Sequence, residues 1–151
     1  MMVMLRTACL GLALLNMASC ARADIAVSAM NADTEVSLSP SVLPRIRSVN
    51  IKENGATSPA AGKLDPQCKR FRLTRSNVID YLRTAQVVTE QDYLHTLDWS
   101  PCFASGTVYF EGGVYGVWGI QQYRAGSLKL SDGREIYLFC PKCKSRLFSN
   151  L

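Results

Sequence analysis

The sequence predicts an α+β fold in which one main helix packs on a four-stranded antiparallel meander. A segment with helical spacing of apolar residues covers 75–85 and follows residues that favour a helix start. After Pro101 the apolar residues follow a period of two, and glycine-containing dipeptides interrupt the pattern. Four cysteines fall within 66–151, enough to staple a domain of this size with disulfides.

The first 23 residues have the order of a bacterial secretory signal. Arg6 precedes an apolar run of eight residues, 8–15, which is too short for a bilayer that needs about 20. Two processing sites stay open. An A-x-A sequence ending at Ala23 would leave Asp24 as the mature N-terminus, whereas a lipobox-like sequence would end the signal at residue 19 and lipidate Cys20. We therefore expect a periplasmic or secreted protein, or an outer-membrane lipoprotein that meets the membrane only through this anchor.

Residues 24–65 are predicted to be a flexible linker. They contain no aromatic residue, few large apolar residues, and frequent Ser, Ala, Asn, Gly and Pro. Such a composition buries too little surface to offset the entropy of ordering the chain. A weak alternation over 45–52 leaves a strand as the alternative. All 13 aromatic residues lie in 66–151, which we expect to be the folded domain.

Helix signals occur at two places before the strands. Thr74 can cap a helix over 75–85, and Leu73 and Val78 are placed for a hydrophobic staple around that cap. Residues 89–92 repeat a capping pattern and favour a short helix through Leu94. The alternation over 93–99 fits a strand equally well, and both interpretations stay open.

Four strands are predicted, over 106–111, 114–124, 127–130 and 134–140. The dipeptides between them each contain the glycine that hairpin turns need for positive φ: Gly112-Gly113, Ala125-Gly126 and Asp132-Gly133. Short turns join neighbouring strands, so these four form an antiparallel meander with the helix on one face.

The domain owns four cysteines: Cys68, Cys102, Cys140 and Cys143. In an oxidising compartment they are expected to form two disulfides, with three possible connectivities. We prefer a pattern that joins Cys68 and Cys102 each to one of the final pair, because longer closed loops stabilise a small core more.

The motif at 140–143 is the sharpest chemical signal, since C-x-x-C occurs in redox dithiols and zinc sites. A thioredoxin-like site needs its first cysteine at a helix N-terminus, whereas this motif ends the last strand. Cys68 and Cys102 are 34 residues apart, without the paired spacing of a second zinc half-site. No metal and no cofactor is therefore predicted, and a thiol-redox or metal-binding protein is kept as an alternative function.

His95 and Asp98 near Cys102 suggest a cysteine hydrolase, which would need a free thiol as nucleophile. That thiol is not expected in an oxidising compartment, and the sequence has no G-x-S-x-G, H-E-x-x-H or P-loop motif. No catalytic residue is predicted, and the protein is expected not to be an enzyme.

Basic and aromatic residues form the candidate binding surface. Past residue 65, 11 Lys and Arg face seven Asp and Glu, with cations clustered at 69–75 and 142–146. A disulfide from Cys68 would join both clusters into a patch for an acidic protein or an anionic envelope component; a solvated charged rim is the alternative. Half of the aromatic side chains on the strands should form a second, exposed face. The candidate residues are Arg70, Arg72, Arg75, Lys142, Lys144, Tyr115 and Trp118.

The leader, the Leu73-Thr74 helix start, the segments 97–102 and 118–120 and the closing 137–140 together resemble small uncharacterised exported proteins of Gram-negative bacteria. The resemblance covers about the last 80 residues. It names no reaction, but some exported domains of this general size serve as immunity proteins or inhibitors. We therefore predict a non-enzymatic periplasmic binding module that occludes a protein partner and does not bind nucleic acid. A structural envelope lipoprotein is the further alternative.

Overall fold

The computed structural model describes Val36 and residues 38–148. The predicted signal, both processing sites, Cys20 and the first part of the predicted linker lie outside the described residues. The elements, in chain order, are β1 (Ser39–Pro40), β2 (Ile46–Thr57), the 3₁₀ helices η1 (Pro59–Ala61) and η2 (Pro66–Arg70), α1 (Arg75–Thr84), β3 (Gln86–Val88), α2 (Glu90–His95), β4 (Cys102–Phe110), β5 (Tyr115–Gln121), β6 (Ala125–Leu130) and β7 (Glu135–Phe139).

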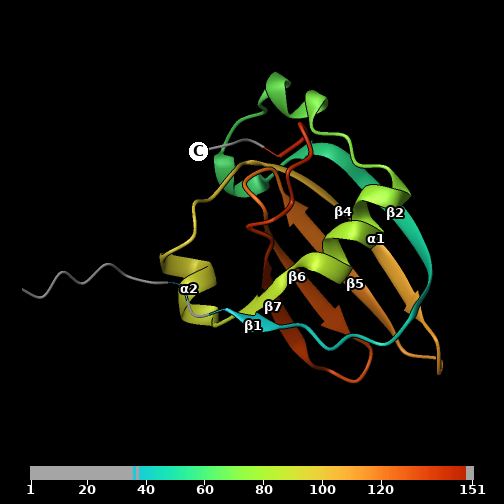
Figure 1. Cartoon of the computed structure of the whole chain (residues 1–151). Helices are drawn as coiled ribbons and strands as arrows, with labels where there is room; N and C mark the ends of the chain where they lie inside the picture. The colour runs from blue at the N-terminus through green and yellow to red at the C-terminus, as the bar shows by residue number, and fades with distance from the viewer. Residues whose placement is uncertain (1–35, 37, 149–151) are drawn as a thin grey trace, which may run out of the picture. The chain divides into compact units, whose positions relative to one another are not determined.

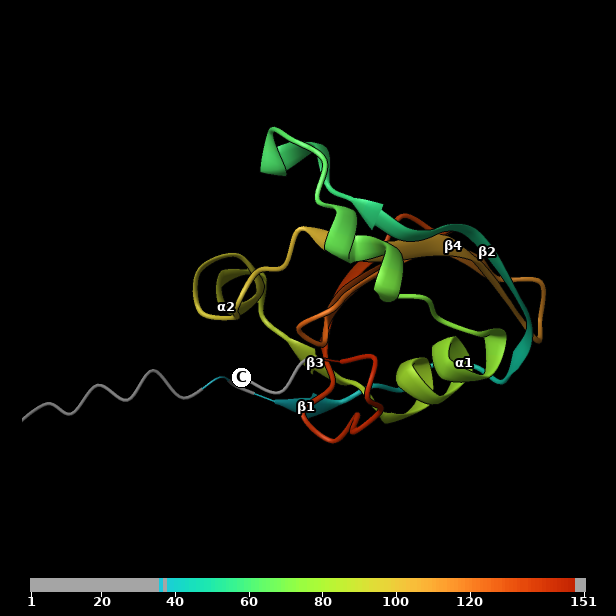
Figure 2. The ribbon, with the colours of Figure 1, turned by 90° about the horizontal axis from the view of Figure 1, so that it is seen from above.

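The strands form one antiparallel sheet in the order β1-β3-β7-β6-β5-β4-β2. The sheet curves, and α1 lies on its concave side (Figures 1 and 2). The predicted α+β class is confirmed, and β4 to β7 are neighbours in sequence order. The expectation of four strands and one main helix is wrong, because the described sheet has seven strands and α2 is a second α-helix.

The largest difference from the prediction is β2, which pairs along its length with β4. It lies within the stretch expected to be a flexible linker, so the sheet begins well before residue 66. An edge strand needs few apolar residues, and in β2 only Val49 is buried. The side chain of Asn54 then joins β2 to the chain before α1: its Nδ2 donates to the Leu73 carbonyl and its Oδ1 accepts from the Leu73 N–H, both at 2.8 Å.

Both helices begin where the sequence indicates. The Thr74 hydroxyl accepts from the Asn77 N–H, and the Asn77 side chain accepts from the Thr74 N–H, which completes a capping box. The helix buries Val78, Tyr81 and Leu82. For residues 90–95 the structure shows a helix rather than a strand, with Thr89 as its cap.

The predicted turn at Ala125-Gly126 is wrong, because the turn before β6 lies about two residues earlier in the chain. Ala125 and Gly126 lie in β6, and the turn occupies 122–124, where Arg124 adopts a φ of 73°. Gly126 serves packing instead, because a Cβ there would lie 2.7 Å from the Tyr81 hydroxyl. That hydroxyl donates to the Arg124 carbonyl at 2.8 Å, so helix and turn share one contact.

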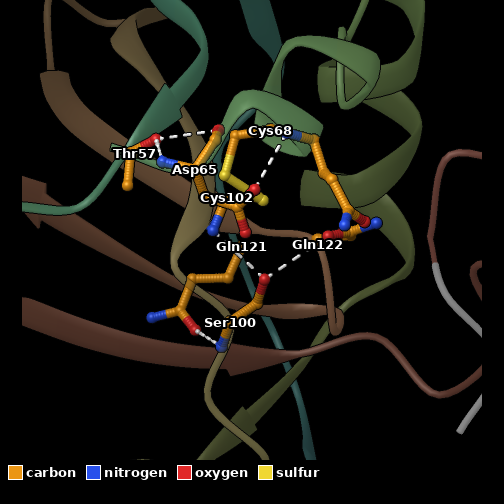
Figure 3. Close-up of a disulfide and its surroundings, with 8 residues drawn as sticks. Thr57, Asp65, Cys68, Ser100, Cys102, Gln121 and Gln122 are labelled. Carbon is orange, nitrogen blue, oxygen red and sulfur yellow. Dashed lines mark hydrogen bonds between the residues drawn. A yellow bond between two sulfur atoms is a disulfide. The ribbon is translucent and has the colours of Figure 1, made fainter. Parts of the chain in front are cut away.

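The disulfides join Cys68 to Cys102 and Cys140 to Cys143. The preferred pattern that linked Cys68 and Cys102 to the final pair is therefore wrong. The first disulfide attaches η2 to the start of β4 (Figure 3). The second closes a tight loop directly after β7. The preference for longer closed loops selected the wrong partners for Cys68 and Cys102. The packing of η2 against β2 and β4, which brings these two cysteines together, cannot be seen in the sequence.

Candidate functional site

One candidate surface is the face of the sheet turned away from α1, called the outer face here. Tyr109 and Tyr115 are paired across β4 and β5, with ring centroids 6.1 Å apart and exposed fractions of 41% and 48%. Val117, on the same face, is 57% exposed. These three residues form the tyrosine patch. Trp118 does not belong to it: its side chain is 1% exposed in the core, which overturns its proposed place on a binding surface.

The second candidate surface is basic. Lys69, Arg70 and Arg72 lie at η2 and just after it, Arg75 begins α1, and Lys142, Lys144 and Arg146 follow β7. All seven are exposed, and together they are called the basic end. The expected disulfide does not join the two clusters. Phe148 does so instead, since its ring lies 5.8 Å from that of Phe71 and 6.0 Å from that of Tyr81.

The cations of the basic end form no ion pair among the described residues, although Asp80 lines the same hollow as Lys142 and Lys144. Among the described residues, 36 and 38–148, ion pairs join Arg45 to Glu111 and Arg134 to Asp132. Neither pair includes a residue of the basic end. The first turn of α1 also contains no acidic residue, although carboxylates are favoured at that position. The positive charge is therefore left for solvent or for a ligand.

The two surfaces are separate. The Cys68–Cys102 disulfide fixes η2 at the start of β4, whereas Tyr109 lies seven residues further along that strand. At a rise of about 3.3 Å per residue this is a distance of about 23 Å. Tyr115 and the basic residues thus do not form one continuous patch, and each surface needs its own test.

The C-x-x-C motif forms a disulfide whose two sulfurs differ in exposure. Cys140 is fully buried, while Cys143 is half-buried and lines a hollow beside α1 with Lys142 and Lys144. A thiolate that attacked Cys143 would release the Cys140 thiolate in a buried position, where desolvation disfavours its charge. This arrangement favours a structural disulfide.

Asp65 lies close to the other disulfide, with ligand atoms of Asp65, Cys68 and Cys102 all within 4.8 Å of one another. Both sulfurs are bonded to each other, so they offer no thiolate to a metal ion. The same bond removes Cys102 as a nucleophile for His95 and Asp98, which are both exposed.

Ser100 has a central position that no pattern in the sequence indicates. Ser100 is buried, and its N–H donates to Gln121 Oε1 at 3.2 Å. Its hydroxyl accepts from the Cys102 N–H at 3.2 Å and lies 3.5 Å from Gln122 Oε1 (Figure 3). Ser100 thereby fixes the loop between α2 and β4. Its neighbour Trp99 is half-exposed, and no local sequence signal distinguishes these roles.

Tyr93 of α2 covers part of the outer face. Its ring lies 4.8 Å from that of Tyr137, and its hydroxyl is 3.5 Å from Gln121 Nε2. Burial raises the pKa of the Tyr93 phenol, while hydrogen bonds with Ser127 and Gln121 lower it in part. Between Tyr93 and Trp99 a pocket of about 190 Å³ opens on the outer face.

Two further findings bear on the environment of the protein. Two disulfides point to an oxidising, non-cytoplasmic compartment. Among the helices of residues 36 and 38–148, none has the length and apolar character to cross a membrane.

Comparison of the chain with protein-family models, curated proteins and solved structures finds no match. The resemblance to exported proteins of Gram-negative bacteria stays a prediction.

Proposed function

We propose that this protein is an exported, non-enzymatic binding module that holds an acidic protein partner at its basic end. One observation carries the proposal: two clusters of cations, distant in sequence, meet at one end of the domain without ion-pair partners among the described residues. By covering the partner's surface, the module would act as an inhibitor or immunity protein.

The physical role of such an end is recognition more than raw affinity. Exposed cations close together repel one another, and a surface of carboxylates on a partner relieves that repulsion. Each exposed pair contributes only about 0.2–1 kcal/mol, so a network of pairs is needed for useful binding. The same field speeds association and selects against basic partners. The chain as a whole has a formal net charge of +5, which supports this preference.

Affinity capture from a periplasmic extract tests the proposal with three baits. The first is the wild-type protein. The second reverses charge at the basic end, and the third makes the same change in net charge on exposed residues elsewhere. The substitutions are Arg70→Glu, Arg72→Glu and Lys144→Glu in the second bait, and Arg47→Glu, Lys52→Glu and Lys129→Glu in the third.

We expect an acidic protein that the wild type and the third bait retain and the second bait loses. Equal loss from both variants would show that net charge alone is responsible. A fourth bait, Tyr109→Ser with Tyr115→Ser, examines the tyrosine patch. Loss of the partner from this bait alone would move the binding surface to the outer face.

A further inference from the structure

Trp99 is a surface aromatic residue that the proposed protein-binding end does not use. Its side chain is 50% exposed, although the adjacent Ser100 is only 1% exposed. Hydrogen bonds from Ser100 to Gln121 and from Cys102 to Ser100 fix the backbone on which Trp99 lies. A tryptophan held at the surface by a fixed loop is typical of a binding anchor.

Two hollows include Trp99 in their lining. The first is the pocket of about 190 Å³ on the outer face, where Tyr93, Phe103, Gln121 and Ser127 join Trp99. The second, of about 550 Å³, is larger and more open: Leu64, Pro66 and Pro101 contribute its apolar wall, and Lys63 and Asp65 also line it. Because both include Trp99, a ligand that occupied both would contact this residue from each hollow. This arrangement fits successive units of a chain better than one compact molecule.

The first pocket selects against charge. Its lining residues are all uncharged, so an ionic group there would lose its hydration without gaining a counter-ion. Hydroxyl groups of Ser58, Tyr93 and Ser127 and the amide of Gln121 lie among the aromatic rings. Pockets for drug-sized molecules measure about 300–1,000 Å³, so this smaller one suits a single ring.

The side-chain amide of Gln121 provides both a hydrogen-bond donor and a hydrogen-bond acceptor. Its Oε1 accepts from the Ser100 N–H, and its Nε2 lies 3.5 Å from the Tyr93 hydroxyl. A primary amide has two donor hydrogens and two acceptor lone pairs, so further capacity of both kinds is left. Sugar hydroxyls donate and accept at once, and the C–H face of a pyranose ring can pack on an indole.

We propose that Trp99 and the two hollows beside it form a binding site for an uncharged sugar chain, with one ring in the outer-face pocket. The aromatic lining alone would also suit a proline-rich peptide. The four polar side chains favour the sugar, because a proline residue offers one carbonyl and no N–H. The site shares no residue with the basic end, although Pro66 begins the 3₁₀ helix η2 that carries Lys69 and Arg70. Either proposal can therefore fail without the other.

The test titrates the mature full-length protein with chitotetraose, cellotetraose, maltotetraose and a proline-rich peptide. Calorimetry gives the affinities, and intrinsic fluorescence locates the site, because the second tryptophan, Trp118, is buried. Trp99→Ala removes the ring, Trp99→Phe keeps an aromatic surface, and Tyr115→Ala is the matched control at another exposed aromatic residue. Circular dichroism confirms that each variant is folded.

We expect at least one tetrasaccharide to bind and to shift the tryptophan emission. Trp99→Ala should weaken that binding at least about tenfold, Trp99→Phe should retain most of it, and Tyr115→Ala should leave it unchanged. Chitotetraose as the best ligand would indicate an N-acetylated glycan of the cell-wall kind, and either glucan a neutral glucose polymer. The assignment is overturned if no tetrasaccharide binds at about 10 mM, if only the peptide binds, or if Tyr115→Ala weakens binding equally.

Discussion

Glycine residues on the central strands set how closely the neighbouring parts of the core approach. A Cβ at Gly106 would overlap the backbone carbonyl of Asn50 on β2 and lie 2.8 Å from Cζ2 of Trp118. At Gly119, by contrast, the nearest atom is the Ser127 hydroxyl at 3.7 Å, an ordinary contact. Replacing glycine should therefore cost different amounts of stability at these two positions.

Gly106→Ala should lower the free energy of unfolding by about 1–3 kcal/mol, because the added methyl group forces β2 and the indole apart. Gly119→Ala is the control and should change the free energy by less than about 0.5 kcal/mol. Urea denaturation of both variants measures the difference. Equal losses would show that the approach of β2 to β4 is not as close as described.

Tyr81 makes the domain sensitive to alkaline pH. Burial, the main cause, raises the pKa of its phenol well above the usual value of 10.0, and charge on Tyr93 raises it further. Above pH 10 the unfolded chain loses this proton while the folded chain keeps it. Folding stability contributed by Tyr81 is thus complete below about pH 10 and decreases as the pH rises further.

Tyr81→Phe should remove that part of the alkaline decrease. At neutral pH it should also cost about 0.5–1.5 kcal/mol, because the Arg124 carbonyl loses the Tyr81 hydroxyl and keeps only the Cys140 N–H, at 3.1 Å, as a donor. Denaturation curves for the wild type and the variant between pH 8 and pH 11 compare the two. Parallel curves over this range, which brackets the usual phenol pKa of about 10, would contradict a buried, protonated Tyr81.

At the level of elements, the two disulfides should contribute unequally. The loop between Cys68 and Cys102 spans 34 residues, and that between Cys140 and Cys143 spans three. Loop-closure entropy then gives about 4 kcal/mol for the first and about 2 kcal/mol for the second. Paired Cys→Ala variants of each disulfide, unfolded in urea, measure both values. A larger loss from the 140–143 pair would mean that the short loop, and not η2, limits stability.

Local signals were sufficient for the elements that depend on neighbouring residues. The capping box at Thr74 and Asn77 marks α1 because its hydrogen bonds join residues three apart. Alternation likewise indicates β4 to β7, and turn glycines mark two of the three turns between them, whereas the turn at 122–124 has Arg124 at positive φ. β2 was only an alternative to the linker, over 45–52, because its stability comes from pairing with β4, about 50 residues later, and only Val49 among its residues is buried.

The candidate surfaces also divide into features that neighbouring residues determine and features that depend on tertiary packing. Tyr115 and Trp118 were assigned to one surface, although a spacing of three residues in a strand places two side chains on opposite faces. Alternation alone could have separated them. The joining of the two basic clusters by Phe71 and Phe148 could not have been predicted, because it depends on tertiary packing. The Trp99 site likewise exists only after Ser100 and Gln121 meet.

For the whole molecule, the central proposal is that separate clusters of cations form one recognition surface. Mutual repulsion at this end is screened by salt, and so is attraction to an acidic partner, with a Debye length near 10 Å at about 0.1 M. Binding through the basic end must therefore depend on ionic strength, whereas binding through the tyrosine patch would depend on it little.

The most direct measurement is the affinity for the captured partner between about 0.05 and 0.5 M salt, for the wild type and for the variant reversed at Arg70, Arg72 and Lys144. The wild-type affinity should fall by at least about tenfold across this range, and the variant should bind weakly at every concentration. An affinity independent of salt, or one that the reversed variant retains, would contradict recognition by the basic end.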